Sequence, residues 1–307
     1  CTLLDALGAD IPFMVVEPVK GEYRALRRKA KNIEVYTMEA GGPEQLRMNP
    51  FWFPPGGRLQ YHIDSLRTII ASAFELSAAM PNILEQCLTN VYVKLGWNIA
   101  TSKNIFQDKL PEEKLYPTFS MLCSEIEHFL EKADFGPELK GNYKGAMLSR
   151  LQTFTNGAKG MLLDCSAKPR FQQWIDNKTS CIIELDALAD DADKAIVMGV
   201  ILSQYFQCVK VRGTVAASGL KHIIVLEEAH HLFKNTESSQ STGDVSKRHL
   251  VEMLSNVLAE IRAYGEGIFI VDQSPTSVSP QVIKNTAVKI IHRVDYETDL
   301  SVLQHTL

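Results

Sequence analysis

The sequence of 307 residues lacks the short motifs that mark many enzyme active sites. It has no GxSxG turn, the nucleophile elbow of many hydrolases, and no GxGxxG dinucleotide fingerprint. A GxxxxGK[ST] phosphate-binding loop is also missing from these 307 residues. The adjacent His230 and His231 do not have the spacing of an HExxH zinc helix. We therefore expect these two histidines to have a structural role rather than to bind a metal.

Cysteine pairs, long apolar runs and excess positive charge are missing as well. The six cysteines are scattered without a CxxC pair, which predicts buried, reduced thiols in a cytoplasmic protein. No apolar run approaches the roughly 18 residues that cross a bilayer, so no membrane partner is expected. The net charge is −4, so any DNA contact has to come from local basic patches or from a ring of subunits.

Short apolar runs that end at polar residues are present, and they are typical of buried parallel strands. Helical patterns lie between them, at 193–205 and 250–264. This alternation predicts an α/β fold with a mainly parallel sheet, whose ligands bind at the carboxyl ends of the strands. The predicted strands are 13–16, 182–183, 223–226, 268–271 and 288–291, with a weaker one at 33–37.

The stretch from about 59 to 160 breaks this alternation and contains only helical patterns. We interpret it as a helical insertion, so that residues 1–58 and 161–307 form the two parts of the sheet domain. Thr118, which follows Pro117, is a plausible N-cap for one of the helices. The four predicted helices are 61–78, 82–95, 118–132 and 143–154.

The strongest candidate site is the acid pair that follows the 223–226 strand. Glu227 and Glu228 come directly after this apolar run and are followed by Ala229 and His230. In a nucleotide-hydrolysing enzyme the first acid of such a pair holds a hydrated magnesium ion, and the second polarises the attacking water. The alternative interpretation is that both acids are solvated in a loop. The apolar strand before them makes this alternative the weaker one.

A second acid, Glu17, ends the 13–16 strand, and Gly21 permits a tight turn after it. Glu17 could sit near the metal or the attacking water, across from Glu228. A plain strand–turn–helix with exposed acids explains this segment equally well.

Gln273 and Arg262 are the remaining candidates. Gln273 follows the 268–271 strand, where a neutral amide can sense a γ-phosphate or the attacking water; a turn residue before Pro275 is the alternative. Arg262 falls roughly 95° from the centre of the apolar stripe of its helix, so it can lean toward a neighbouring subunit. An arginine that complements the helix dipole is the commoner case. Gly265 is the expected C-cap.

Taken in order, these segments resemble the HerA-type ATPases of the HerA/FtsK superfamily. The resemblance is carried by Val15-Val16-Glu17-Pro18-Val19-Lys20-Gly21-Glu22-Tyr23, Leu226-Glu227-Glu228-Ala229-His230, Arg262-Ala263-Tyr264-Gly265 and Asp272-Gln273-Ser274-Pro275. It implies a RecA-like P-loop NTPase core with a helical insertion, and ATP and Mg²⁺ as cofactors. It further implies an ATP-driven DNA translocase or helicase that works as a hexamer, with a nuclease as a possible partner.

The resemblance also implies a role for each candidate. Glu227 would bind the magnesium ion, Glu228 would be the catalytic base and Gln273 the sensor. Arg262 would be an arginine finger that reaches into the neighbouring subunit's site, and Glu17 would stand where relatives often have Asp. Because the chain lacks an initiator Met and begins in a helical pattern, we expect a fragment whose phosphate-binding loop lies upstream of Cys1. Such a fragment is expected to bind ATP poorly.

Two other functions remain open at this point. A conjugation or type IV secretion ATPase shares the same core, and a non-hydrolysing ring scaffold would need no phosphate loop. A GxxxxGK[ST] upstream of Cys1 would remove the scaffold, and DNA-stimulated hydrolysis would help to separate the other two.

Overall fold

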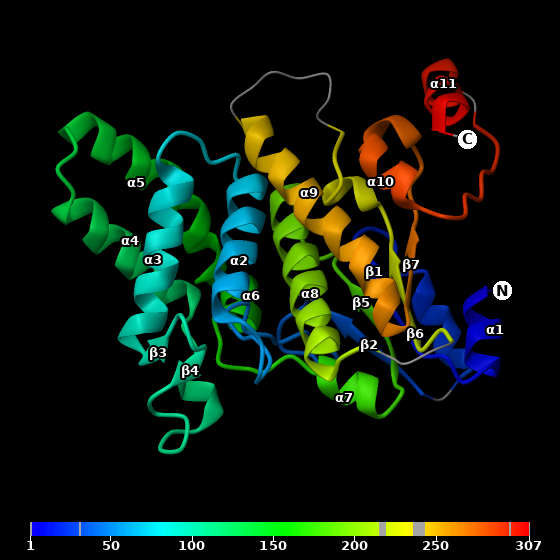
Figure 1. The fold of residues 1–307 in the computed structure, drawn as a ribbon, viewed down its shortest axis with the longest axis horizontal. Helices are drawn as coiled ribbons and strands as arrows, with labels where there is room; N and C mark the ends of the chain where they lie inside the picture. Colours follow the sequence, from blue (N-terminus) through cyan, green and yellow to red (C-terminus); the bar gives the residue numbers. More distant parts are fainter. Residues whose placement is uncertain (1, 31, 215–218, 236–242, 295, 307) are drawn as a thin grey trace.

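The computed structural model describes all residues except 1, 31, 215–218, 236–242, 295 and 307. Its centre is a five-stranded parallel sheet in the order β2-β5-β1-β6-β7 (Figure 1). This sheet confirms the predicted α/β class. Its strands are β1 (Phe13–Glu17), β2 (Ile33–Thr37), β5 (Ser180–Glu184), β6 (His222–Leu226) and β7 (Glu266–Ile270), and a small antiparallel pair is formed by β3 (Trp97–Asn98) and β4 (Lys103–Asn104).

The strands are apolar on both faces because both faces are covered. In β1, Phe13 and Val15 face a small core that also includes α1 (Thr2–Gly8) and the 3₁₀ helix η1 (Tyr23–Arg28). Met14 and Val16 alternate with them and face the large core on the other side. This double burial explains why the central strands are continuous apolar runs.

Two long helices cover the large-core face of the sheet, α8 (Asp191–Arg212) and α9 (Gly243–Ile261). The predicted apolar stripe of α9 is buried, and Gly265 adopts the left-handed conformation expected of a C-cap. Helix α8 extends further than predicted in both directions, because Asp190 caps its first turn and its apolar residues continue to Val209. The 3₁₀ helix η5 (Arg262–Tyr264) leads from α9 into β7. Shorter elements follow β7: η6 (Pro275–Ser277), α10 (Pro280–Asn285) and α11 (Glu297–Thr306).

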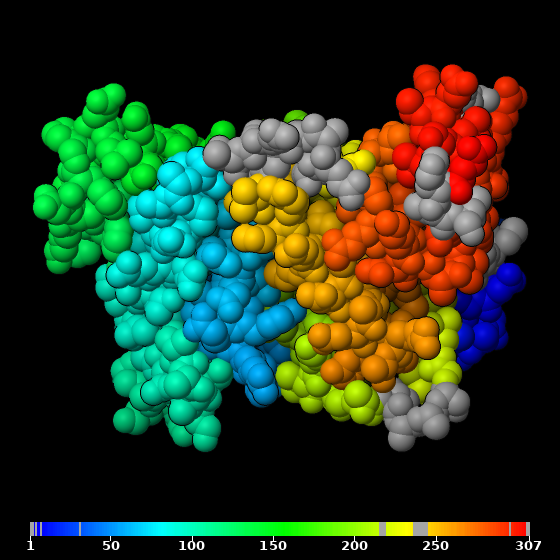
Figure 2. Space-filling view, turned by 45° about the horizontal axis from the view of Figure 1, so that its top comes forward, coloured from blue at the N-terminus to red at the C-terminus, as the bar shows by residue number. Residues whose placement is uncertain are grey.

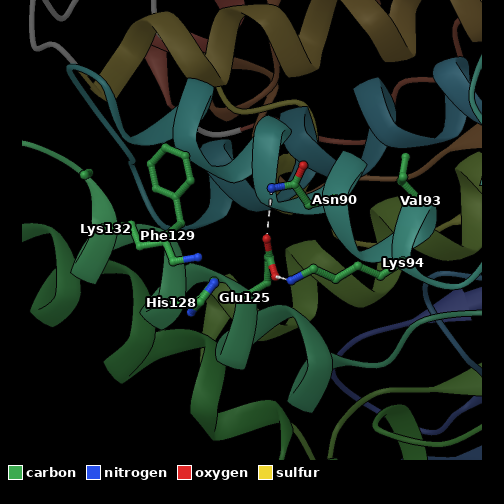
Figure 3. Close-up of a pocket in the computed structure, with 8 residues that line it drawn as sticks. Asn90, Val93, Lys94, Glu125, His128, Phe129 and Lys132 are labelled. Carbon is green, nitrogen blue, oxygen red and sulfur yellow. Dashed lines mark hydrogen bonds and ion pairs between the residues drawn. The ribbon is translucent and has the colours of Figure 1, made fainter.

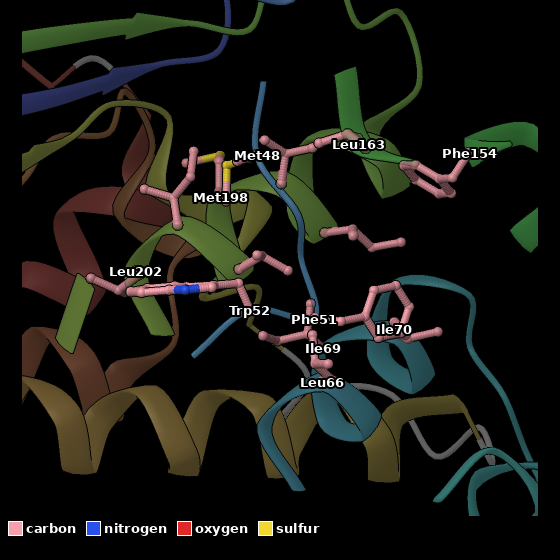
Figure 4. Packing of buried hydrophobic residues seen from close by; sticks show 14 of the residues in the cluster. Met48, Phe51, Trp52, Leu66, Ile69, Ile70, Phe154, Leu163, Met198 and Leu202 are labelled. Atoms are coloured by element: carbon pink, nitrogen blue, oxygen red, sulfur yellow. The ribbon is translucent and has the colours of Figure 1, made fainter. Parts of the chain in front are cut away.

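The stretch predicted to be helical forms one end of the molecule, opposite the carboxyl-terminal segment (Figure 2). The side chain of Thr118 accepts a hydrogen bond from the backbone N–H of Met121 and thus caps α4, as predicted. One apolar cluster runs from these helices to the sheet. Figure 4 shows the part of it around Trp52, Leu66 and Leu202. The helices are α2 (Leu59–Ala73), α3 (Met80–Lys94), α4 (Phe119–Lys132), α5 (Pro137–Leu151) and α6 (Gly157–Leu163), with η2 (Glu112–Lys114) and η3 (Gln152–Phe154) between them; α7 (Phe171–Asp176) follows.

A buried amide joins α8 to the loop that enters the helical part. The Nε2 of Gln204, which is fully buried, lies 3.0 Å from the carbonyl oxygens of Asn49 and Pro50 and 2.7 Å from that of Trp52. A side-chain amide nitrogen donates through two hydrogens, so Gln204 shares them among the buried carbonyls of this loop.

One strand prediction is wrong. Residues 288–291 form no strand, and Val288 and Ile290 are 77% and 76% exposed. The segment has the composition of a strand, but within the described residues β7 pairs with β6 alone, so 288–291 has no neighbouring strand to bond with.

Two further sequence predictions concern membranes and thiols. No helix among the described residues is long and apolar enough to span a bilayer. Five cysteines within the described part of the chain are buried and free, as predicted, whereas Cys1 lies outside it.

Candidate functional site

Acidic and amide side chains gather at the carboxyl edge of the sheet. Because all five strands are parallel, the residues that end β1, β5, β6 and β7 meet at this one edge. Glu17 and Glu184 are register partners on adjacent strands, and Val16 pairs with Leu226, which directly precedes Glu227. The predicted clustering of polar residues at one edge is therefore present.

Glu228 turns the chain sharply after β6. It has φ 46° and ψ 52°, the left-handed conformation that is uncommon for residues with a side chain. The next residue, Ala229, donates its backbone N–H to the carbonyl of Val271, 3.2 Å away. This bond holds the turn against the chain that leaves β7 and brings the segments after β6 and β7 together.

Glu228 is bonded to the predicted glutamine. The Nε2 of Gln273 donates to Oε1 of Glu228 over 2.6 Å. The other oxygen, Oε2, lies 3.5 Å from Nδ1 of His230. Asp272 completes the group, with its Oδ2 2.9 Å from the same nitrogen. The two candidates that sequence reasoning assigned to attacking water and γ-phosphate thus touch each other.

Glu227 faces a different and more acidic group. Its carboxylate accepts a hydrogen bond from the hydroxyl of Tyr23, and the charges of Glu227 and Glu184 both act on Glu17. Glu17 therefore lies beside Glu227, and no contact joins it to Glu228 among the described residues. This arrangement differs from the expected position of Glu17 across from Glu228, because the left-handed turn at Glu228 brings that side chain to Gln273 after β7 instead.

Two of these acids are held by the segment that follows β1. Glu17 accepts the backbone N–H groups of Glu22 and Tyr23 at 2.9 and 3.4 Å, and Gly21 makes the turn with φ 62°. Arg24 binds Glu184 through two nitrogens at 3.0 and 2.5 Å. The loop after β1 is thus fixed by acids of its own sheet edge.

The acidic group suits a divalent cation. Burial raises the pKa of Glu17, the N–H groups of Glu22 and Tyr23 lower it, and the charges of Glu184 and Glu227 raise it further. Closely placed carboxylates repel one another, and a hard cation offsets that repulsion. Glu17 and Glu184 already have N–H and arginine partners, so Glu227, the more accessible acid, is the residue of this group that could hold a hydrated Mg²⁺.

Arg262 lies far from this group within the chain. It is exposed, forms no ion pair with another described residue, and opens the turn that precedes β7. Arg262 precedes β7, whereas Glu228 and Gln273 come after the carboxyl ends of β6 and β7. The length of a five-residue strand, about 17 Å, therefore separates Arg262 from their edge of the sheet. Contact between Arg262 and such a site requires a second subunit.

A separate shallow groove of about 500 Å³ lies between α3 and α4 (Figure 3). Glu125 on its floor accepts a hydrogen bond from Asn90 and pairs with Lys94. Because its buried carboxylate already has partners from α3, the groove is part of the packing between these helices.

Sequence reasoning missed three members of the edge. Glu184 follows the predicted strand at 182–183, and the sequence gives no role to it, to Asp272 or to Tyr23. A signal existed for Glu184, which follows an apolar run in the same way as Glu17 does. No signal in the sequence pairs Tyr23 with Glu227, because 204 residues separate them.

No family model matches the chain, and no curated protein matches it in sequence. Solved structures do match its fold. VirB4 of Thermoanaerobacter pseudethanolicus superimposes with a TM-score of 0.64 at 19% identity, over 92% of this chain and 68% of that one. The bacterial conjugative coupling protein TrwB, in an unbound form, gives 0.51 at 11% identity over 92% of this chain and 60% of its own. The fold is that of a RecA-like ATPase core.

TrwB in complex with ADP and Mg²⁺ also gives a TM-score of 0.51, at 11% identity. Here the match covers 99% of this chain and 63% of TrwB, so the chain spans less than two thirds of the length of TrwB. VirB4 and TrwB are members of the HerA/FtsK/VirB4 superfamily of P-loop ATPases. At these identities the similarity is one of fold, and it does not single out a HerA-type ATPase.

Proposed function

We propose that this chain is most of the motor core of an ATPase, in which Glu228 is the general base and Gln273 its sensor. The observation that carries the proposal is the 2.6 Å hydrogen bond between Gln273 and Glu228 at the carboxyl edge of the sheet. A base that orients attacking water must be held in one direction, and an amide that bonds to it can report on the γ-phosphate.

Glu227 would hold a hydrated Mg²⁺ in this scheme, with the hydroxyl of Tyr23 fixing one of its oxygens. The ion, when bound, offsets the negative charge of the phosphates and of the acids around it. Glu17 keeps the loop after β1 in place through the N–H groups of Glu22 and Tyr23 and so acts as a positioning residue.

The comparisons support one kind of motor over the other. Similarity to VirB4 and to a conjugative coupling protein favours an ATPase of conjugation or type IV secretion. A HerA-type DNA translocase working as a hexamer, with a nuclease partner, is the second candidate, and it rests on the order of the four sequence segments. Stimulation of hydrolysis by DNA would exclude a passive scaffold and would favour the DNA translocase, because a secretion ATPase can move protein instead of DNA.

The test is ATP hydrolysis by the whole encoded polypeptide and its Glu228→Gln variant. Loss of a general base lowers the rate by about 10²–10⁴-fold while nucleotide binding is kept. The exposed Glu131 on α4 supplies a matched control as Glu131→Gln, which should hydrolyse ATP at the wild-type rate. Equal rates for wild type and Glu228→Gln would overturn the proposal, and a wild type that binds ATP without hydrolysing it would favour the scaffold.

A further inference from the structure

Three side-chain atoms that could bind a metal lie close together at the carboxyl edge. The hydrogen bond between Glu228 and Gln273 does not by itself explain this arrangement. Nδ1 of His230, one carboxylate oxygen of Glu228 and one of Asp272 all lie within 4.8 Å of one another. Nδ1 is 3.5 Å from Oε2 of Glu228 and 2.9 Å from Oδ2 of Asp272. Ligands about 2.0–2.1 Å from a tetrahedral ion are separated by about 3.4 Å, so these distances approach those of a formed site.

The other oxygen of each carboxylate is already engaged. Oε1 of Glu228 accepts from Gln273, and Oδ1 of Asp272 accepts the backbone N–H of Ser274 at 3.1 Å. Each acid therefore directs its second oxygen toward the imidazole of His230. Hydrogen bonds from outer residues that orient metal ligands in this way are a regular feature of protein metal sites.

The group is accessible and held by the backbone. The side chain of His230 is 36% exposed, and those of Glu228 and Asp272 are 15% and 9% exposed. The backbone N–H of His230 also donates to Asp272, which ties the turn after β6 to the chain after β7. An ion can thus reach the three atoms, and little rearrangement of the chain is needed to bind it.

We propose that Glu228, His230 and Asp272 form a binding site for a divalent transition-metal ion of the Zn²⁺ class. An imidazole nitrogen with two carboxylate oxygens suits such ions, whereas Mg²⁺ prefers oxygen ligands alone. Three protein ligands leave a fourth position open to water. His230 thus has a ligand role in place of the structural role expected from its spacing.

This site is distinct from the magnesium position proposed at Glu227. Zinc binding itself does not depend on the proposed function. A bound ion would also occupy the oxygen of Glu228 that faces away from Gln273, and it would thereby block hydrolysis. This second effect rests on the proposed function.

The test is a Zn²⁺ titration of the whole polypeptide without nucleotide, in competition with a coloured chelator. Wild type and the control His128→Gln, which changes an exposed histidine in the groove of Figure 3, should each bind one tight Zn²⁺ that excess Mg²⁺ does not displace. His230→Gln and Asp272→Asn should each weaken that binding at least about 10-fold. Equal affinity in wild type and His230→Gln, or no tight binding by wild type, would overturn the site.

Cobalt substitution covers the case in which a variant does not fold. Co²⁺ bound by wild type through nitrogen and oxygen should show visible d–d bands without the strong near-ultraviolet absorption of thiolate ligation. A thiolate band would assign the ion to cysteine and refute the site. If Glu228→Gln abolishes hydrolysis while His230→Gln binds Zn²⁺ as tightly as wild type, the proposed function stands and this site fails. If wild type binds one Zn²⁺ and Glu228→Gln has no effect on hydrolysis, this site stands and the proposed function fails.

Discussion

Glu227 and Glu228 are neighbours in the chain, yet they belong to two different regions of the sheet edge. Glu227 faces β1, where it accepts from Tyr23 and lies beside Glu17, whose other acidic neighbour is Glu184 on β5. Glu228 faces the chain that leaves β7, where it meets an amide, an imidazole and a carboxylate. The left-handed turn at Glu228 marks the boundary between the two regions.

The difference shows how one residue type can serve two purposes at one edge. The region of Glu227 holds excess negative charge, which makes it suitable for a cation. In the region of Glu228, Gln273 donates to one oxygen of the acid and the other oxygen faces His230, which fixes the direction of the carboxylate. Charge is thus the main property of the first region and geometry that of the second.

The largest expected effect concerns a residue outside both regions. If Arg262 serves the site of a neighbouring subunit, Arg262→Ala lowers the ATPase rate of the assembled protein by about 10³–10⁵-fold, because the transition-state charge loses its cation. Steady-state hydrolysis measures this, and the thermal unfolding temperature should not change because Arg262 is exposed.

Arg248→Ala, at the other end of α9, is the matched control and should retain the wild-type rate. Mixing Arg262→Ala chains with Glu228→Gln chains should restore part of the activity, since some interfaces then combine an intact arginine with an intact base. A rate for Arg262→Ala within a few-fold of wild type would contradict the role.

A smaller effect tests the region of Glu227. Arg24→Ala removes the cation that pairs with the buried Glu184. The carboxylate of Glu184 then lies beside Glu17 without that cation. The free energy of unfolding should fall by about 1–3 kcal/mol, measured by urea denaturation at neutral pH. Arg27→Ala breaks a more exposed pair with Glu44 and should cost less than about 0.5 kcal/mol. Equal losses would show that burial of Glu184 does not matter.

The smallest effect depends on pH. Burial is the main cause that raises the pKa of Glu17 above its ordinary 4.5, so the folded protein holds this proton more tightly than the unfolded chain. The resulting stabilisation is present at low pH and is lost as pH rises from 4.5 through the folded pKa. The stability of wild type relative to Glu17→Gln should therefore decrease over that range in urea denaturation at a series of pH values. An increase with pH would contradict the shift.

Much of the fold could be predicted from the sequence. Apolar runs that end in acids identified β1, β5, β6 and β7, because strands buried on both faces have no polar positions to interrupt them. The same rule failed at 288–291, where the composition of a strand occurs without a neighbouring strand. Composition reports what a segment can do, and pairing depends on partners elsewhere in the chain.

The candidate site was predictable only in part. Strand ends identified Glu17, Glu227, Glu228 and Gln273, because parallel strands bring their ends to one edge. The division into two regions was not predictable, since glutamate gives no signal for the left-handed turn that separates them. The position of Glu17 next to Glu184 depends on strand register, which the sequence does not specify.

The bonds of Gln204 to three carbonyls bear on how the molecule can move. Rotating the helices of residues 59–163 away from α8 about the loop at 49–53 would break these bonds and leave the buried amide nitrogen of Gln204 without a partner in an apolar interior. The loop is therefore a rigid joint between the two halves. Motion of these helices relative to the sheet therefore has to arise elsewhere in the molecule, or both halves rotate as one body.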